Sequence, residues 1–399
     1  TWRRGLVVGA ALAGAAAAAA AVAALAHPAL IASLGGAPPL QPAAPPVPAA
    51  AATAIGDVDF SPTVPVPSFE GRQHRELRVC ADGCDFDSLT AAVRRARDGD
   101  VIRLAPAMYR DCIADIDKNI AIVGDIGADG VRPTFDTACA RKAALNFSSE
   151  YFRLEGLQFQ DIAVPDRNGA CVRLQPSGSQ VAHLRNIICI RSENGVLGNT
   201  GPEGALIVEE SLFAENGRAG RAHGLYINGG REVVIRNTLI HSSRDHGHSL
   251  KVGARRLLVQ SSVIAALDGN NSRAIDFYGG GVLLVEDSVL QQGPNSDNHD
   301  LIGVATEARR LNEGVPRAIL VRDSWLIYDD AERCCRWLLS GRENGEMVFE
   351  NNRFVAITGS HLKGYRERAN ERFRTRRDAG LEDYRAAVDA LPFPRAWQQ

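Results

Sequence analysis

The sequence has no excess of charge of either sign, because 45 Lys and Arg residues stand against 47 Asp and Glu residues. A chain without a basic surplus gives no reason to expect a nucleic-acid partner. Aromatic residues make up only 6% of the chain, whereas glycine occurs 38 times. This balance favours a core of Val, Ile and Leu with many tight turns, where glycine readily adopts a positive φ.

Zinc-binding motifs are also missing, since the chain has neither a pair of CxxC motifs nor HExxH. The eight cysteines are even in number and fall into neighbouring pairs along the sequence, at Cys80 and Cys84, Cys112 and Cys139, Cys171 and Cys189, and Cys334 and Cys335. If the chain is exported, we expect some of them to form disulfides. The alternative is that buried thiols fill core positions.

The N-terminal region is typical of export. Two arginines precede an apolar, alanine-rich run over residues 5–34, with a possible cleavage site at residues 24–26. We interpret residues 1–36 as a signal peptide or, because the run is long enough to span a bilayer, as a membrane anchor and tether. Residues 37–70 are rich in Pro and Ala and predict an extended linker. Both interpretations place the protein in the periplasm or outside the cell, with a possible anchor in the inner membrane.

The central part of the chain, from about residue 205 to residue 303, repeats one short phrase. It consists of an apolar pair, a polar pair, a second apolar pair, a turn rich in Gly, Asn and Asp, and another short strand. The polar pair recurs at Asn186, Glu210, Asn237, Ser261, Asp287, Asp323 and Asn351, about 24 to 28 residues apart and once about 36. This period is typical of solenoids. Because no helix fits between the strands, the pattern predicts an all-β fold, a single right-handed parallel β-helix over residues 71–360.

Both ends of the repeat region show helical patterns. Residues 86–96 have apolar positions at helical spacing with Asp87 or Ser88 as the N-cap, and we expect this helix to cover the first coil. Residues 361–399 are charged and predict a C-terminal helical cap. The phrase F-x-S-L-x-x-A-V-x-x-A-x-x-G-D-V-I-x-L-A-P-x-x-Y over residues 86–109 resembles the opening of pectate-lyase-like β-helix proteins. This resemblance implies the fold and a carbohydrate-active role.

Alternation along the strands predicts which side chains point outward. Leu225, Leu250, Ile275 and Ile302 align as one inward column, followed by Ile227, Val252, Phe277 and Val304. The residues between them, Tyr226, Lys251, Asp276 and Gly303, must then lie together on one outer face. Their neighbours on that face include Asn228 and Tyr278. Five of the nine histidines also fall between residues 223 and 299, most of them at the turn before these strands.

These residues predict a groove for an extended acidic polysaccharide. β-Elimination at a uronic acid needs a cation near the carboxylate, a base for the C5 proton and an acid for the leaving oxygen. We assign Lys251 as the base, Arg273 as the group that holds the carboxylate, and Tyr226, Tyr278 or His248 as the acid, with Asp276 beside them. The expected substrate-binding residues are His223, Asn228, His246, Tyr278, Asn298, His299 and Asp300.

The order of Lys251 and, about one coil later, Arg273 resembles β-helical alginate lyases and chondroitinase-B-type lyases. That resemblance implies a lysine base, an assisting arginine and a Ca²⁺ ion that neutralises the carboxylate. The resemblance makes calcium a possible cofactor. Because the matching Asn and paired Glu set is missing here, no metal ligand is assigned. Residues 245–248 resemble the histidine region of mannuronan C5-epimerases, although Asp-Pro-His-Asp is absent. Residues 248–251, 274–276 and 291–298 resemble a run in uncharacterised secreted bacterial β-helix proteins.

Several alternatives to a lyase stay open. A C5-epimerase would use the same face without cleavage, and an inverting hydrolase could use Asp276 and Asp300 on adjacent coils. A non-catalytic carbohydrate-binding or envelope β-helix protein is a further alternative, in which Lys251 and Asp276 form an ordinary ion pair. We expect a monomer whose partner is an acidic polysaccharide.

Overall fold

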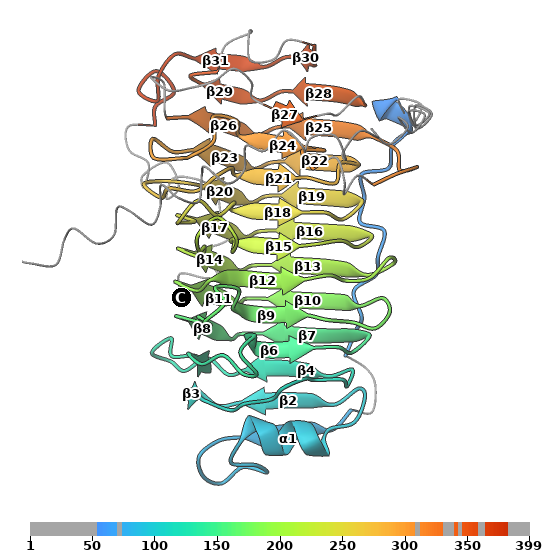
Figure 1. The fold of residues 1–399 in the computed structure, drawn as a ribbon, viewed down its shortest axis with the longest axis vertical. Coiled ribbons are helices and arrows are strands. Elements are labelled where there is room, and N and C mark those ends of the chain that lie inside the picture. Colours follow the sequence, from blue (N-terminus) through green and yellow to red (C-terminus); the bar gives the residue numbers. More distant parts are fainter. Residues whose placement is uncertain are drawn as a thin grey trace, which may run out of the picture. The chain divides into compact units, whose positions relative to one another are not determined.

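The computed structural model describes residues 54–69, 74–307, 312–329, 339–341, 345–357 and 364–381. In these ranges short strands pair in parallel and stack into three sheets, so that each rung contributes one strand to each sheet over most of the stack. Figure 1 shows the rungs following one another from the helix α1 (Leu89–Arg95) to the last strands. The expectation of an all-β, single parallel β-helix is confirmed.

We call the sheets A, B and C. Sheet A contains β1 (Glu76–Val79), β2 (Val101–Leu104), β4 (Ala121–Gly124), β7 (Tyr151–Glu155), β10 (Val181–Arg185), β13 (Ala205–Glu209), β16 (Glu232–Arg236), β19 (Arg256–Gln260), β22 (Val282–Glu286), β25 (Ala318–Arg322), β28 (Glu346–Glu350) and β30 (Arg366–Arg368). Sheet B contains β3 (Met108–Tyr109), β5 (Thr134–Phe135), β8 (Gln158–Gln160), β11 (Ile188–Ile190), β14 (Leu212–Ala214), β17 (Leu239–His241), β20 (Val263–Ala265), β23 (Val289–Gln292), β26 (Trp325–Tyr328), β29 (Arg353–Val355) and β31 (Glu371–Phe373). Sheet C contains β6 (Ala143–Phe147), β9 (Ala170–Leu174), β12 (Asn194–Gly198), β15 (Leu225–Ile227), β18 (Leu250–Val252), β21 (Ile275–Phe277), β24 (Ile302–Val304) and β27 (Leu339–Gly341).

The recurring polar residue lies at the corner between sheets A and B. All seven predicted positions have a positive φ between 46° and 53°, a conformation that Asn and Asp tolerate better than most residues. The next residue points inward and, in the later rungs, accepts a hydrogen bond from the backbone of the preceding rung. Thr238 N donates to Ser262 Oγ, and Ser262 N donates to Ser288 Oγ, each at 3.1 Å. The corner therefore forms a buried ladder in which polar groups are satisfied.

The first rung is covered by α1, as its position in the sequence predicts. Ser88 is the N-cap, and its Oγ accepts a hydrogen bond from Ala91 N at 3.4 Å. Leu89, Ala92 and Val93 are buried in the main core. The helix thus covers apolar side chains that the open end of the first rung would otherwise expose to water.

A strap formed by residues 54–69 packs along the outer face of sheet A, and we expected this segment to be part of a linker. Phe60 and Val64 pack on an apolar stripe that includes Ile207, Val234 and Leu258. Figure 1 shows the strap in blue beside the sheet. The unit built around the β-helix therefore begins before residue 70. The outward-facing side chains of this stripe are apolar, so sheet A needs a cover that shields them from water.

The expected C-terminal helix is wrong for residues 364–381, because β30 and β31 add a further rung there. The last strands of a sheet present unpaired backbone groups, and another strand satisfies them better than a helix does. Tyr365 and Phe373 still contact the end of the stack as predicted, with ring centroids 5.6 Å from Phe349 and 5.9 Å from Trp325. Residues 382–399 lie outside the described residues.

Three disulfides join Cys80 to Cys84, Cys112 to Cys139 and Cys171 to Cys189. The expectation that neighbouring cysteines pair is confirmed for these six residues, while Cys334 and Cys335 lie outside the described residues. In the part of the chain that the structure describes, no helix has the length and apolar character to cross a bilayer. The expected signal peptide or anchor at residues 1–36 also falls outside the described ranges.

Candidate functional site

The predicted outer column exists on sheet C. The strands β15, β18 and β21 are neighbours in register, which places Tyr226 beside Lys251 and Lys251 beside Asp276. The flanking residues of each strand point into the main core. Period-two alternation therefore brings three chemically different side chains onto one wall from three successive rungs.

Lys251 lies at the centre of a cluster of contacting side chains. The other members are Tyr226, His248, Arg273, Asp276, Tyr278, Asp300 and Glu307. Lys251 Nζ is 2.7 Å from Glu307 Oε1 and 3.5 Å from Asp276 Oδ2, so two carboxylates contact one ammonium group. The rings of Tyr226 and Tyr278 flank it, with centroids 5.5 and 5.2 Å from Nζ. Both distances are within the range of cation–π interactions. The lysine is thus held by charges on one side and aromatic faces on the other.

Asp276 is the most buried charged residue of the cluster, with 2% of the residue exposed. Thr306 Oγ1 donates to its Oδ1 at 2.8 Å, and His248 Nε2 lies 3.3 Å from its Oδ2. Arg273 approaches the same carboxylate at 3.8 Å and also pairs with Asp300. A buried carboxylate of this kind needs such partners to offset the loss of hydration.

One histidine of the cluster stacks on a second histidine. The rings of His223 and His248 are 5.2 Å apart, and His248 N donates to His223 Nδ1 at 3.0 Å. Burial holds the pKa of both imidazoles well below 6.5, and the positive charge of Lys251 acts in the same direction. Both rings are therefore neutral near pH 7, and the contact to Asp276 favours a proton on His248 Nε2.

A groove with a volume of about 790 Å³ adjoins the cluster on sheet C. The outward residues Arg173, Leu197 and Tyr226 lie along its floor, and Asn199 and Asn228 line it from the turns that follow sheet C. Tyr226 belongs to both places, because it lines the groove and contacts Lys251. The groove therefore gives a ligand direct access to one edge of the cluster.

Tyr278 is buried, with 1% of the residue exposed, although we expected it to bind substrate. Its ring fits against Gly253 on the preceding rung. A Cβ atom at residue 253 would lie 2.5 Å from Tyr278 Cζ. Glycine is therefore required there by the close approach of the phenol ring. The ring supports Lys251 from below, and Tyr226 is the tyrosine that faces the groove.

The other predicted binding residues divide into two groups. Asn298 and Asp300 hold Arg273, since Asn298 Oδ1 accepts from its Nη2 at 3.5 Å and Asp300 pairs with its Nε. His246 and His299 instead line a separate hollow of about 550 Å³ at the turns between sheets B and C. There His246 Nδ1 lies 3.5 Å from Asp297 Oδ2. These two histidines are near the other predicted site residues in the sequence, but they do not line the groove.

Sequence reasoning missed three residues of the site. Glu307 and Thr306 follow β24, where the chain turns back over Lys251 and Asp276. Arg173 belongs to β9, three strands away from Lys251 in sheet C. Aligning this earlier strand with the central repeats would have placed Arg173 in the outer column, whereas the return of residues 306 and 307 leaves no periodic signal.

The donor set does not fit a calcium ion. The three carboxylates of the cluster, Asp276, Asp300 and Glu307, each pair with Lys251 or Arg273. Ca²⁺ needs six to eight oxygen ligands. Within the described ranges, no three His, Cys, Asp or Glu side chains are arranged to hold a metal ion. We therefore derive no step through calcium.

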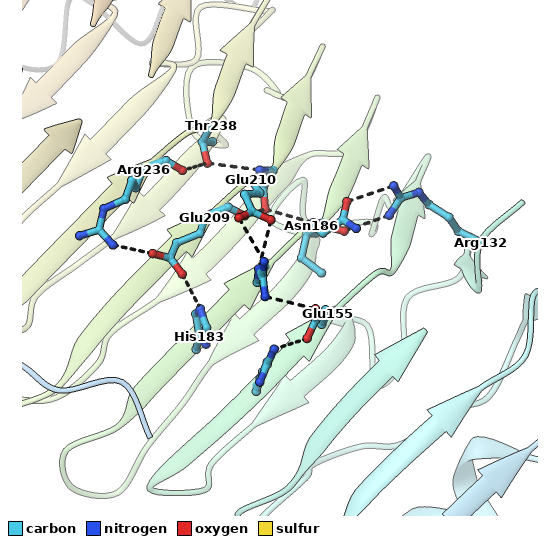
Figure 2. A network of polar contacts seen from close by, with 12 residues as sticks. Arg132, Glu155, His183, Asn186, Glu209, Glu210, Arg236 and Thr238 are labelled. Carbon is cyan, nitrogen blue, oxygen red and sulfur yellow. Dashed lines mark hydrogen bonds and ion pairs between the residues drawn. The ribbon is translucent and has the colours of Figure 1, made fainter. Parts of the chain in front are cut away.

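A second polar network lies on sheet A and is shown in Figure 2. His183 Nε2 is 3.0 Å from Glu209 Oε2, and Arg236 Nη1 is 2.6 Å from Glu209 Oε1. The hydrogen bond from His183 holds the pKa of the Glu209 carboxyl below its usual value, and Arg236 adds to this effect. Glu209 thus pairs with His183 of one neighbouring rung and Arg236 of the other, so the network joins successive rungs.

Comparison with known proteins adds little to this geometry. A scan against protein-family models finds no match, and a search of curated proteins finds none. Among solved structures, two crystal structures of pectin methylesterase in complex with hexasaccharides, one of them of a variant, are similar. Each has a TM-score of 0.31 and 13% identity, and the match covers 74% of this chain and 82% of the other. This likeness gives no information about reaction or substrate. The fold and the site define a parallel β-helix protein with a buried charge cluster beside a groove.

Proposed function

We propose that sheet C binds an extended polysaccharide that contains uronic acid, and that the cluster around Lys251 cleaves it by β-elimination. The observation that carries the proposal is the position of Tyr226, which lines the groove and lies against Lys251. A substrate in the groove would therefore present one sugar to a hydroxyl group beside a held ammonium group. A groove that runs across several neighbouring strands suits a chain-like ligand.

β-Elimination removes the C5 proton, forms the C4=C5 double bond and breaks the C4–O4 bond, after which the leaving oxygen takes up a proton. We expected Lys251 to be the base. In an ion pair with two carboxylates, however, Lys251 is an ammonium group and has no lone pair to accept a proton. We therefore assign both proton transfers to Tyr226, which would remove the C5 proton and return a proton to the leaving oxygen. Lys251 supplies positive charge beside Tyr226. Arg273, which we expected to hold the substrate carboxylate, pairs with Asp276 and Asp300.

The neutral histidines support this assignment because they hold neighbouring side chains of the cluster in position. His223 contacts the Tyr226 ring edge-on, with centroids 4.8 Å apart. His248 holds Asp276, which in turn holds Lys251. Because both imidazoles are uncharged near neutral pH, they fix the tyrosine and the carboxylate without repelling Lys251.

A hydrolase is less well supported by the same geometry. Asp276 and Asp300 are bridged by Arg273, and Asp276 is almost completely buried. An inverting glycosidase needs room for a water molecule between its two carboxyl groups. The bridging guanidinium occupies that position.

The three disulfides support an exported protein, because such bonds persist in oxidising compartments such as the periplasm and the extracellular space. An acidic polysaccharide of the cell envelope or of the surroundings would be available there. The location and the substrate class are thus compatible with each other.

The test is to incubate the protein with polymannuronate, polyguluronate, polygalacturonate and glycosaminoglycans while recording the ultraviolet absorbance of the new conjugated double bond. We expect one of them to give this absorbance, and Tyr226→Phe and Lys251→Ala to abolish it. Reducing ends without absorbance would show hydrolysis instead. Changed uronate stereochemistry without cleavage would show an epimerase, and binding without any reaction would show a non-catalytic protein.

A further inference from the structure

The end of the groove far from Lys251 holds an arginine without a carboxylate partner. Arg173 Nε donates to Gln175 Oε1 at 3.0 Å, and Nη1 donates to the Asn168 carbonyl at 3.3 Å. Lys142 Nζ donates to the same Gln175 oxygen at 3.3 Å. Among the described residues, neither Arg173 nor Lys142 forms an ion pair.

The other cations at the groove and the cluster are all paired. Arg255 contacts Glu203 at 2.7 Å, Lys251 contacts Glu307 at 2.7 Å, and Arg273 pairs with Asp300. An arginine that faces a groove and is bound only by neutral acceptors has capacity left for an anion. Its planar guanidinium suits a carboxylate, which can accept two parallel hydrogen bonds.

The surroundings of Arg173 make an added anion favourable. Burial lowers the pKa of the guanidinium, and the charge of Asp166 opposes this only in part. Its neighbour in the outer column is Asn146, whose side-chain amide is fully buried and has no hydrogen-bond partner among the described residues. Polar groups that lose water without gaining partners are costly. A carboxylate bound at Arg173 would offset part of the cost of burying its positive charge.

The register fixes how far Arg173 lies from the cluster. The outer column runs from Arg173 through Leu197 and Tyr226 to Lys251, which is three steps between neighbouring strands. Each step is about 4.8 Å, so the separation along the sheet is about 14 Å. Several units of an extended sugar chain are needed to cover that length.

Beyond Lys251, the described residues cover the outer column. A Cβ atom at Gly303, the next position in the column, would lie 2.8 Å from Asp276 Oδ1 and 3.0 Å from Thr306 Cγ2. Glu307 covers Lys251 from the same side. A bound chain can therefore extend from Lys251 along the groove, toward Arg173.

We propose that Arg173 binds the carboxylate of a uronic acid unit several sugars away from the reacting unit, on the side of the cluster where the groove lies. The reaction near Lys251 rests on the proposed function, whereas the anion site rests on the contacts of Arg173. The affinity for acidic oligosaccharides should then rise sharply once a chain is long enough to reach from Lys251 to Arg173.

The test is calorimetric titration of the full chain with oligogalacturonates and oligomannuronates from dimer to octamer, and with neutral oligosaccharides of equal length. Arg173→Gln should weaken binding of long acidic chains about 10- to 100-fold and leave dimers unchanged. Arg173→Lys should restore part of the loss. Arg191→Gln, which removes a positive charge from an exposed ion pair with Asp161, is the matched control and should change nothing.

The outcomes separate the two proposals. Arg173-dependent binding without any ultraviolet product in the wild-type protein would keep the anion site and overturn β-elimination. Cleavage by the wild-type protein with unchanged length dependence in Arg173→Gln would overturn the anion site. Equal weakening of dimers and octamers, or absence of binding to any acidic oligosaccharide, would also overturn it.

Discussion

Asp276→Asn separates the charge of the buried carboxylate from its shape. The asparagine keeps the size of the side chain, and its oxygen can still accept the hydrogen bond that Thr306 now donates at 2.8 Å. Lys251 keeps Glu307 and Arg273 keeps Asp300, so neither cation is left unpaired. We therefore expect a loss of only about 1–3 kcal/mol in the free energy of unfolding.

Asp276→Ala provides the contrast. It removes the carboxylate, leaves His248 Nε2 without its acceptor, and opens a small space at a residue that is 2% exposed. Breaking a buried pair in this way costs about 3–5 kcal/mol. If the charge of Asp276 is needed to hold Lys251 and His248 in place, both variants should lose at least about 10²-fold in turnover, although their stabilities differ.

Turnover is measured as the initial rate of ultraviolet absorbance on the polymer that the wild-type protein cleaves, and stability by urea unfolding of the same preparations. Asp161→Asn is the control, because Asp161 makes an exposed pair with Arg191 away from the groove. It should change neither quantity by a measurable amount. Full turnover by Asp276→Asn would refute the reasoning, since the carboxylate charge would then have no part in the reaction.

Three further predictions concern stability and packing. Burial keeps the pKa of His223 and His248 well below 6.5, so below that pH the unfolded chain binds protons that the folded chain does not. Thermal denaturation should therefore show the free energy of unfolding falling by about 1.4 kcal/mol per pH unit and per histidine from pH 6.5 downward. His223→Phe should reduce that slope, and an unchanged slope would contradict the prediction. Glu232→Ala removes a fully buried carboxylate that accepts hydrogen bonds from the strap. Urea unfolding should show a loss of about 3–5 kcal/mol in the free energy of unfolding, and limited proteolysis should cut within residues 54–69. Resistance of the strap to proteolysis in this variant would contradict the prediction. Gly253→Ala places a methyl group against the ring of Tyr278, so it should cost about 1–3 kcal/mol, and the loss should be smaller in a protein that already carries Tyr278→Leu; equal losses would show that the contact is not limiting.

Much of the fold follows from period and alternation. The polar residue of each repeat, such as Asn186 or Asp287, marks a corner because its side chain tolerates a positive φ. The inward residues Leu225 and Leu250 fix the face of Tyr226 and Lys251, since a slip of one residue would turn every side chain over. Regular elements of this kind leave a signal in the sequence.

The remaining parts of the site depend on contacts that carry no period. Glu307 reaches Lys251 from a segment that follows β24, and nothing in its local sequence distinguishes it from an exposed glutamate. The strap consists largely of residues without alternation, so its Phe60 contact with sheet A depends on the apolar stripe that it covers. The strands of the last rung are short and charged, so their sequence resembles a helix, although the open edge of β28 favours a strand there.

The strap changes how the stack can come apart. In a solenoid each rung touches only its neighbours, so unfolding can begin at one end and proceed rung by rung. Here Phe69 packs beside β2 and β4, Thr63 binds Glu232 on β16, and Ile55 N donates to Glu346 on β28. One peptide therefore spans almost the full length of sheet A, so peeling the terminal rungs also disturbs contacts with the middle ones. The array should melt as a more cooperative whole than its repeats alone would.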